Sequence, residues 1–350
     1  MTGDAVGGVW TYALELADAL EPHGTEVVLA TMGPAPSRAQ EEELARSAIE
    51  DLRVSSFALE WTDEPWTDVA AAGAWLLDLA DELDPDLVHL NGYAHGALPW
   101  PCPVLIAGHS CVLSWWRAVR GGEPPPRLNP YRDAIRRGLA GADLLVTPTR
   151  ALLTELEGLY GPRCARRVIP NGRRPVVARE KEPYVLAAAR AWDEAKNLTT
   201  LDHAAPATPW PVLVAGDGGE RLANVQPLGR VERTQLDDLL GRATIYAAPA
   251  LYEPFGLGAL EAATAGCALV LGDIPSLREV WAEAAAFVEP RDADALAAAL
   301  TELAEDEPRR AALAARAQDR ARLYAPERMA ASYVDAYRHL TATAAVEATA

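Results

Sequence analysis

Two glutamates, Glu253 and Glu261, lie in residues 252–266, a segment whose composition suits the recognition of an anion or a sugar. An apolar segment precedes Glu253, and a helix that carries Glu261 is expected to begin near Gly256 and Gly258. Glycines allow a ligand to approach the free backbone N–H groups at a helix start closely. A carboxylate at each end of this turn can accept hydrogen bonds from vicinal hydroxyls. A capped helix with two surface glutamates is the alternative that these residues leave open.

Two basic residues, Arg190 and Lys196, follow the apolar residues 184–188. Two fixed cations on one loop suit a diphosphate, because guanidinium and ammonium groups both bind phosphate oxygens. Lys196 is one of only two lysines in the 350-residue chain, so its position on this loop is notable. A solvated surface loop with two cations is the alternative.

The glycine pair Gly7-Gly8 stands directly before a helical pattern at residues 10–20. Since neither residue has a side chain, backbone N–H groups at the helix start can approach a phosphate there. A tight turn is the alternative, because a glycine pair alone is a weak sign of a binding site.

Three polar side chains in the first half of the chain follow apolar segments. His109 comes after residues 103–107, and Asn91 and Tyr93 come after residues 86–90. If these segments are parallel strands, their carboxyl ends meet at one edge of a sheet, where ligands bind. A lone histidine is more often structural, which is the alternative for His109. Asn91 and Tyr93 are candidates for shaping a binding site.

The sequence indicates neither a metal site nor an activated nucleophile. The four cysteines and six histidines have no metal-ligand spacing, and no Ser/His/Asp arrangement or Walker-type loop is present. The cysteine spacing fits buried thiols in a reducing cytosol. The chain lacks both a secretory signal and an apolar run of about 18 residues that would span a bilayer. We therefore expect a cytoplasmic protein without a metal or a cofactor.

Short apolar segments alternate with helical patterns along the chain, which predicts parallel strands covered by helices on both faces, a doubly wound α/β fold. The pattern restarts after a segment rich in Arg, Pro and Gly. We expect an N-terminal domain at 1–170, a hinge at 171–183, a second domain at 184–326, and a helix at 327–345 that crosses back to the first domain. Two such domains would enclose a cleft, at whose rims ligands bind. The expected strands are residues 26–30, 86–90, 103–107, 143–147, 184–188, 211–215, 244–248, 268–271 and 285–288.

The formal charge of −18 is unevenly distributed. Residues 1–116 carry 3 basic and 19 acidic side chains, whereas residues 117–196 carry 16 basic and 9 acidic side chains. The overall negative charge argues against nucleic acid or an anionic membrane as a partner. The locally basic middle of the chain, which ends at Arg190 and Lys196, can still bind an anion.

Residues 252–266 resemble the Glu-x7-Glu motif of retaining GT-B glycosyltransferases of family 4, also called glycosyl transferases group 1. The resemblance extends from about residue 3 to about residue 340 and implies the GT-B fold, in which two doubly wound Rossmann-like domains face a central cleft. The resemblance is strong because six segments match the family in order and spacing. The other matching segments are Gly7-Gly8-Val9, His109, Ile169-Pro170-Asn171-Gly172, Arg190 with Lys196, and Leu228-Gly229-Arg230-Val231.

The resemblance also implies a role for each matching residue. Catalysis would involve Glu253 and His109, which lie near the transferred sugar in the family, and Glu261 would bind the ribose. The remaining groups are Arg190, Lys196, Gly8, Gly256 and Leu257 at the donor diphosphate, Glu253, Phe255 and Gly256 at the donor sugar, Gly229, Arg230 and Val231 beside the nucleobase, and Gly7, Asn91 and Tyr93 as candidates on the acceptor side.

The implied activity is the transfer of a sugar, with retention and without a metal, from a UDP-, GDP- or ADP-sugar to an acceptor hydroxyl. We expect a soluble acceptor, because residues 1–116 are too acidic to dock on membrane lipids. A GT-B-type epimerase or phosphorylase, and a nucleotide-sugar-binding subunit without turnover, are the alternatives.

The start of the chain departs from the family pattern. The family has a hydrophobic first strand of several residues before the glycine loop, whereas only residues 1–6 precede that loop here. The comparison predicts a truncated first strand, either because the true start lies upstream or because the strand is clipped. A truncated strand would weaken the first sheet and reduce activity.

Overall fold

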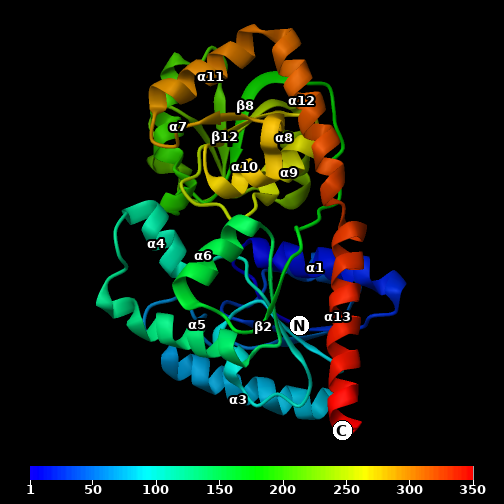
Figure 1. Ribbon diagram of the computed structural model, residues 1–350. Helices are drawn as coiled ribbons and strands as arrows, with labels where there is room; N and C mark the ends of the chain where they lie inside the picture. The colour runs from blue at the N-terminus through cyan, green and yellow to red at the C-terminus, as the bar shows by residue number, and fades with distance from the viewer. Residues whose placement is uncertain (350) are drawn as a thin grey trace. The chain divides into compact units, whose positions relative to one another are not determined.

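The structure, a computed structural model, describes residues 1–349, which form two compact α/β units (Figure 1). Unit 1 comprises Met1–Arg117, Gly122–Gly172 and Pro326–Ala350. Unit 2 comprises Ala118–Gly121 and Arg173–Ala325. All of the strand pairs in both units are parallel. The predicted α/β class is therefore confirmed.

Unit 1 contains two parallel sheets, with strand orders β1-β2-β3 and β4-β5-β6-β7. The sheets meet at β1 and β4, because the backbone N–H of Asn91 donates to Oγ1 of Thr2 at 2.9 Å and Nδ2 of Asn91 donates to the Thr2 carbonyl at 2.7 Å. The strand order therefore reverses its direction between β1 and β4. The strands are β1 (Thr2–Asp4), β2 (Val27–Met32), β3 (Ile49–Val54), β4 (Val88–Leu90), β5 (Val104–Ala107), β6 (Leu144–Thr147) and β7 (Ala165–Val168).

Strand β5 is buried on both faces, which explains its continuous apolar sequence. Leu105 shares one core with Tyr12 and Tyr333, whereas Ile106 shares a second core with Ile135 and other side chains of the opposite face. The helices of this unit are α1 (Gly8–Leu20), α2 (Arg38–Leu44), α3 (Trp66–Leu83), α4 (Val112–Arg120), α5 (Asn129–Gly141), α6 (Arg150–Tyr160) and α13 (Pro326–Thr349).

The C-terminal helix α13 packs on α1, and Figure 1 shows it as the long red helix beside the blue one. Met329 and Tyr333 of α13 share a core with Tyr12 and Leu16 of α1. The Tyr12 hydroxyl donates to the Tyr333 hydroxyl at 2.6 Å inside this core. The end of the chain thus completes unit 1. Within residues 1–349 no helix combines the length and the apolar character that crossing a membrane would require.

Unit 2 contains one sheet with strand order β10-β9-β8-β11-β12-β13, which reverses its direction between β8 and β11. Leu186 and Leu269 face one core, whereas Val185 and Val270 face another, so the central strands are buried on both faces. The strands are β8 (Glu182–Ala188), β9 (Val212–Ala215), β10 (Gln226–Gly229), β11 (Ala243–Ala248), β12 (Ala268–Gly272) and β13 (Ala286–Val288). The helices are α7 (Leu198–Ala204), α8 (Arg233–Arg242), α9 (Leu257–Thr264), α10 (Pro275–Trp281), α11 (Ala293–Glu305) and α12 (Glu307–Ala321).

Strands β3 and β7 lie at sheet edges, and the sequence pattern predicts neither of them. Both contain charged residues, such as Arg53 in β3 and Arg166 in β7. An edge strand with one solvated side has no continuous apolar run, so the pattern that predicts the central strands is missing.

The first strand, expected to be truncated, is three residues long and is fully formed. Thr2, Gly3 and Asp4 pair in parallel with β2, and Thr2 is 4% exposed. The Met1 ammonium group donates to the Val28 carbonyl at 2.7 Å, which extends the pairing by one residue. The first strand is therefore short but paired along its whole length, and the expected weakening of this sheet stays a prediction.

Candidate functional site

A lysine and a glutamate meet beyond the carboxyl ends of the two central strands of unit 2. Lys196 lies on the loop after β8, and Glu253 lies on the loop after β11. The Lys196 Nζ is 2.7 Å from Oε2 of Glu253, and each side chain is 23% exposed. Because the strand order reverses between β8 and β11, this is the place in a doubly wound sheet where ligands bind. The structure thus brings together two of the predicted site residues.

Backbone hydrogen bonds hold these two loops against each other. The Leu251 N–H donates to the Ala195 carbonyl at 2.8 Å. Asn197, directly after Lys196, donates from Nδ2 to the Pro249 carbonyl at 2.8 Å. Asn197 has a φ of 54°, a left-handed conformation that asparagine tolerates better than most residues. The position of Lys196 is therefore fixed by its own loop as well as by Glu253.

Glu253 is also bound to the turn that begins α9. Its Oε1 accepts a hydrogen bond from the Gly256 N–H at 3.1 Å. Gly256 has a φ of 91°, and a Cβ there would lie 3.1 Å from a Leu277 methyl group. A side chain at this position would therefore be strained and crowded. Leu257 begins α9, so the backbone N–H groups of its first turn lie next to the Glu253 carboxylate.

The Phe255 side chain points into the core. It is 3% exposed and packs edge-on against Tyr324, with ring centroids 5.4 Å apart. Phe255 can therefore contact a ligand only through its backbone.

Arg190 lies on the same loop as Lys196 but has different partners. Its guanidinium stacks on the Trp192 ring, 4.8 Å from the centroid, and lies 3.4 Å from Oδ2 of Asp193. The Arg190 side chain is 39% exposed, so it can reach a ligand from this stacked position. Trp192 is not predictable from the sequence, because a single aromatic residue on a loop carries no spacing signal.

Glu261 on α9 is buried between two arginines. Its Oε1 accepts hydrogen bonds from Nε of Arg173 and from Nη1 of Arg233, both at 2.7 Å. The Glu261 side chain is 8% exposed, against 14% for Arg173 and 28% for Arg233. Two guanidinium groups on one carboxylate fix its orientation. Arg173 and Arg233 are site neighbours that the sequence analysis missed, because neither belongs to a motif with a fixed spacing.

Gly229 is the last residue of the edge strand β10 in unit 2, and Arg230 and Val231 follow it. The Gly229 carbonyl accepts a hydrogen bond from the Gly216 N–H at 2.8 Å, and Gly229 has a φ of 65°. The Arg230 side chain is exposed, and Val231 is half-buried. Their expected place beside a nucleobase remains a prediction.

In unit 1, His109 is held by a chain of hydrogen bonds that ends at β1. Its Nε2 lies 2.8 Å from Oδ1 of Asn91, and Nδ2 of Asn91 donates to the Thr2 carbonyl. Because Asn91 uses its N–H on Thr2, its oxygen must accept from His109, which places the histidine hydrogen on Nε2. Burial lowers the pKa of His109 to about 4, so the ring is neutral at pH 7 and its Nδ1 is a hydrogen-bond acceptor.

His109 also packs against a buried aromatic cluster. The Tyr12 ring meets it edge-on, with centroids 4.4 Å apart. His89 lies in the same cluster, with Nδ1 2.6 Å from the Tyr337 hydroxyl, and burial lowers its pKa well below 6.5. Helix α13 thus supports the side of unit 1 where His109 lies.

Three other predicted residues of unit 1 differ in exposure. Tyr93 is 3% exposed, and its hydroxyl donates to the Ser110 carbonyl at 2.8 Å, so its side chain packs the loop in place. Gly7, exposed at the start of α1, has a φ of 133° that favours glycine. Gly8, the first residue of α1, is likewise exposed.

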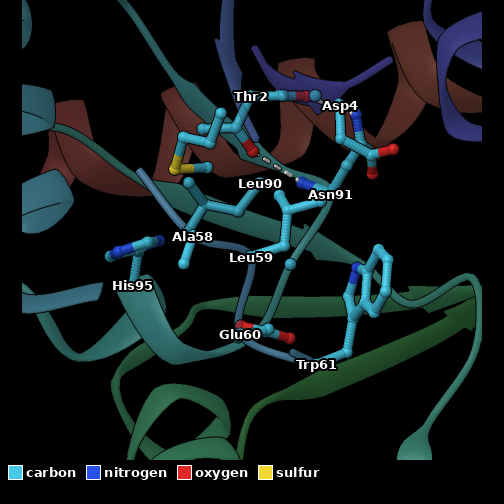
Figure 2. A pocket seen from close by; sticks show the side chains of 12 residues that line it. Thr2, Asp4, Ala58, Leu59, Glu60, Trp61, Leu90, Asn91 and His95 are labelled. Carbon is cyan, nitrogen blue, oxygen red and sulfur yellow. Dashed lines mark hydrogen bonds between the residues drawn. The ribbon is translucent and has the colours of Figure 1, made fainter. Parts of the chain in front are cut away.

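Unit 1 also contains a pocket beyond the ends of β1, β2 and β4, which Figure 2 shows from close by. No group of three or more His, Cys, Asp or Glu side chains suited to a metal ion was found among the described residues. The residues that line the pocket are Thr2, Gly3, Asp4, Met32, Ala58, Leu59, Glu60, Trp61, Leu90, Asn91, Gly92 and His95.

Comparisons with known protein families match both halves of the chain. Residues 6–175 match the family described as Glycosyltransferase Family 4, and residues 169–320 match Glycosyl transferases group 1. The glycogen synthase of Mycobacterium tuberculosis is 27% identical over 340 residues, covering 83% of this chain and 81% of that protein.

Solved structures of glycosyltransferases share the fold. Sucrose-phosphate synthase from Thermosynechococcus elongatus superimposes with a TM-score of 0.82 at 20% identity, covering 98% of this chain and 96% of that one. Anabaena HepE in complex with UDP-glucose superimposes with a TM-score of 0.74 at 18% identity, covering 97% of this chain and 99% of that one. The two units therefore have the GT-B fold.

Proposed function

The chain is a glycosyltransferase of the family 4 type, and we propose that it transfers a sugar, with retention, from a nucleoside-diphosphate sugar to an acceptor hydroxyl. We also propose that the reaction needs neither a metal nor a cofactor, and that it serves carbohydrate biosynthesis. The family matches from residue 6 to residue 320 support it. HepE, a protein of the same fold, has been solved with UDP-glucose, which supports a nucleotide-sugar donor.

The observation that carries this proposal is the contact between Lys196 and Glu253, at 2.7 Å, beside the start of α9. A cation, a carboxylate and helix N–H groups suit the two parts of a nucleotide sugar that meet at the reacting carbon, the diphosphate and the sugar. The cation and the N–H groups suit the diphosphate, and the carboxylate suits the sugar hydroxyls. We propose that donor binding separates the pair, with Lys196 turning to a phosphate oxygen and Glu253 to the sugar.

Bond breaking at the donor leaves negative charge on the diphosphate. Lys196 and Arg190 would stabilise that charge more strongly as it develops, which lowers the barrier. The bond from the anomeric carbon to the phosphate oxygen breaks, and a bond to the acceptor oxygen forms on the same face. The leaving phosphate takes the acceptor proton, so no protein base is needed. We propose that a neutral His109 lies at the transferred sugar, as the resemblance to the family implies, and accepts a hydrogen bond from a sugar hydroxyl.

Glu261 would hold the ribose of the donor. Arg173 and Arg233 both donate to its Oε1, which keeps the carboxylate oriented, and ribose hydroxyls would donate to the same carboxylate. The free cysteines found at positions 102, 111, 164 and 267 support a cytoplasmic location, where thiols remain reduced. We propose that the donor is a UDP-, GDP- or ADP-sugar and that the acceptor is soluble.

Release of nucleotide from a panel of UDP-, GDP- and ADP-sugars, with and without an acceptor mixture, tests this function. We expect slow release with at least one donor, and loss of release in Lys196→Ala and Glu253→Ala with folding unchanged. Glu302→Gln, which removes a carboxylate from an exposed ion pair with Arg309, is the control. Donor binding without any release would instead indicate a binding subunit. Pyridoxal absorbance would point to a phosphorylase, and isomerisation of the donor sugar to an epimerase.

A further inference from the structure

A tryptophan on the loop after β8 in unit 2 is exposed to solvent. Trp192 is 53% exposed, although a side chain of this size is normally mostly buried in a folded protein. It lies two residues after Arg190, which the proposed function places at the donor diphosphate. The Arg190 guanidinium stands over the Trp192 ring, 4.8 Å from its centroid, within the range of a cation–π interaction. Packing of the core therefore does not explain this indole, whereas its contact with a ligand-binding arginine does.

The backbone of this loop forms a tight turn that brings the two side chains together. The Asp193 N–H donates to the Arg190 carbonyl at 3.1 Å, so Arg190 and Trp192 are the first and third residues of a hydrogen-bonded turn. The Ala191 N–H donates to the Asp217 carbonyl at 2.8 Å, which ties the turn to the loop after β9. The contact between Arg190 and Trp192 is therefore built on a backbone that is held at two points.

Asp193, the last residue of the turn, contacts the same guanidinium. Its Oδ2 lies 3.4 Å from Nη2 of Arg190, and its Oδ1 accepts a hydrogen bond from the Ala195 N–H at 3.1 Å. The Asp193 side chain is 14% exposed, against 39% for Arg190. The Asp193 carbonyl also accepts a hydrogen bond from the Lys196 N–H at 2.9 Å. The carboxylate is thus fixed by its own loop, which also carries Lys196.

The ion pair alone is a weak support for Arg190. An exposed ion pair contributes little in water, and a long arginine side chain loses conformational freedom when a ligand fixes it. An aromatic ring attracts a guanidinium through its charge and uses none of its N–H donors. A ring under the guanidinium therefore orders the side chain before the ligand arrives and leaves its hydrogen bonding to other partners.

We propose that Trp192 is a positioning residue, whose ring holds the Arg190 guanidinium in the place where the donor diphosphate binds. The inference rests on the proposed glycosyltransferase function and adds a residue that acts on the diphosphate through Arg190. Stacking of the indole on the nucleobase is the competing role, in which Trp192 would contact the nucleotide directly.

A double-mutant cycle on nucleotide binding separates these two roles. UDP, GDP and ADP are titrated calorimetrically into the wild type, Trp192→Ala, Arg190→Ala and the double variant. For the preferred nucleotide we expect Trp192→Ala to bind about fivefold more weakly than the wild type, because an unstacked arginine must be ordered on binding. In the Arg190→Ala background, Trp192→Ala should change the affinity by less than about twofold, since the residue through which it acts is absent.

Two further variants separate the aromatic face from the volume of the side chain. Trp192→Phe keeps a ring and should bind the nucleotide within about twofold of the wild type. Trp192→Leu keeps apolar volume without a ring and should bind as weakly as Trp192→Ala.

Trp210→Ala is the matched control. The Arg310 guanidinium stands over the Trp210 ring, 5.1 Å from its centroid, so this variant also removes the ring from an arginine–tryptophan contact of unit 2. Trp210 lies directly before β9, whereas Arg190 follows the carboxyl end of β8. The control should therefore bind the nucleotide within about twofold of the wild type.

The outcomes distinguish the positioning role from the donor function. Unchanged affinity in Trp192→Ala with weakened affinity in Arg190→Ala would overturn the positioning role and leave the donor site intact. Equal losses from Trp192→Ala in both backgrounds, or a loss in Trp192→Phe as large as in Trp192→Ala, would also overturn it. Failure of all three nucleotides to bind, or full affinity in both Arg190→Ala and Lys196→Ala, would contradict the proposed function and the inference with it.

Discussion

The candidate sites of the two units occupy the same place in their sheets but are built from different interactions. In unit 2 the side chains form ion pairs, between Lys196 and Glu253 and between Glu261 and two arginines. In unit 1 the side chains are joined by hydrogen bonds of a neutral histidine and an amide, from His109 through Asn91.

This difference follows from what each site is proposed to bind. A diphosphate carries charge that must be met by cations, and cations held by carboxylates are in position before the ligand arrives. A sugar hydroxyl carries no charge, so it needs directional hydrogen bonds, which a neutral histidine and an amide can supply. The comparison predicts that the unit 2 site responds to changes of charge, whereas the unit 1 site responds to changes of shape and hydrogen bonding.

Removing the site lysine should have the largest effect. Lys196→Ala is expected to lower kcat/KM for nucleotide release by about 10²–10³-fold, because the charge on the departing diphosphate loses a fixed cation. Lys181→Met is unsuitable as a control, since Lys181 Nζ donates to three backbone carbonyls and supports the fold. Arg309→Met, in an exposed ion pair of unit 2, is a suitable control. An unchanged kcat/KM in Lys196→Ala would contradict the assignment of the donor site.

Breaking the arginine cluster should have the next largest effect, on stability. Glu261→Ala leaves Arg173 and Arg233 without their shared carboxylate, so we expect a loss of about 3 kcal/mol in the free energy of unfolding, measured with urea. Asp237→Ala removes the other, more exposed carboxylate bound to Arg233 and should cost less than about 1 kcal/mol. Equal losses in the two variants would show that Glu261 has no special structural role.

Lowering the pH should decrease the folding stability of the chain through His109. Burial lowers its pKa from 6.5 to about 4, so between these values the unfolded chain binds a proton that the folded chain does not. Folding stability therefore falls as the pH decreases from about 6.5 to 4, by up to about 3 kcal/mol for this residue, and is unaffected by it above pH 7. Urea unfolding of the wild type and of His109→Gln at pH 7 and pH 4 measures this. The variant should lose less stability, and an equal loss in both proteins would contradict the buried neutral ring.

The smallest effect is expected in the aromatic cluster. Tyr12→Phe removes the hydroxyl that donates to Tyr333 and lies 3.5 Å from Nε2 of His89, and should lower the free energy of unfolding by about 1 kcal/mol. Nucleotide release from the donor alone should stay within about twofold of the wild type, because the donor contacts lie in unit 2. A tenfold loss of release would show that the two sites are not chemically separate.

The sequence predicts the central strands well but misses the edge strands β3 and β7. Strands such as β5 and β12 are buried on both faces, and burial on both faces requires a continuous apolar run. The edge strands β3 and β7 carry charged side chains, and the length of β1 is below what a periodicity can reveal. The fold class follows from the alternation of elements, which depends on the central strands alone.

The site is predictable only in part, for a related reason. Spacing and resemblance identify Glu253, Glu261 and Lys196, since each belongs to a recurring segment. Their contacts depend on loop conformations, such as the left-handed Asn197, that no pattern specifies. Trp192 and Arg233 lie in the site but belong to no motif, so only the folded chain shows where they are.

The affinity of Glu253→Gln and Lys196→Ala for free nucleoside diphosphates tests the central claim most directly. If the pair in unit 2 separates when the donor binds, Glu253→Gln releases Lys196 from its partner. Calorimetric titration with UDP, GDP and ADP should then show that the preferred nucleotide binds Glu253→Gln as tightly as the wild type or more tightly, and binds Lys196→Ala more weakly. In the separate assay, both variants should lose nucleotide release from the donor sugar. Two results would contradict the proposed separation of Lys196 and Glu253 on donor binding. One is an unchanged nucleotide affinity in Lys196→Ala, and the other is a weakened nucleotide affinity in Glu253→Gln with nucleotide release from the donor intact.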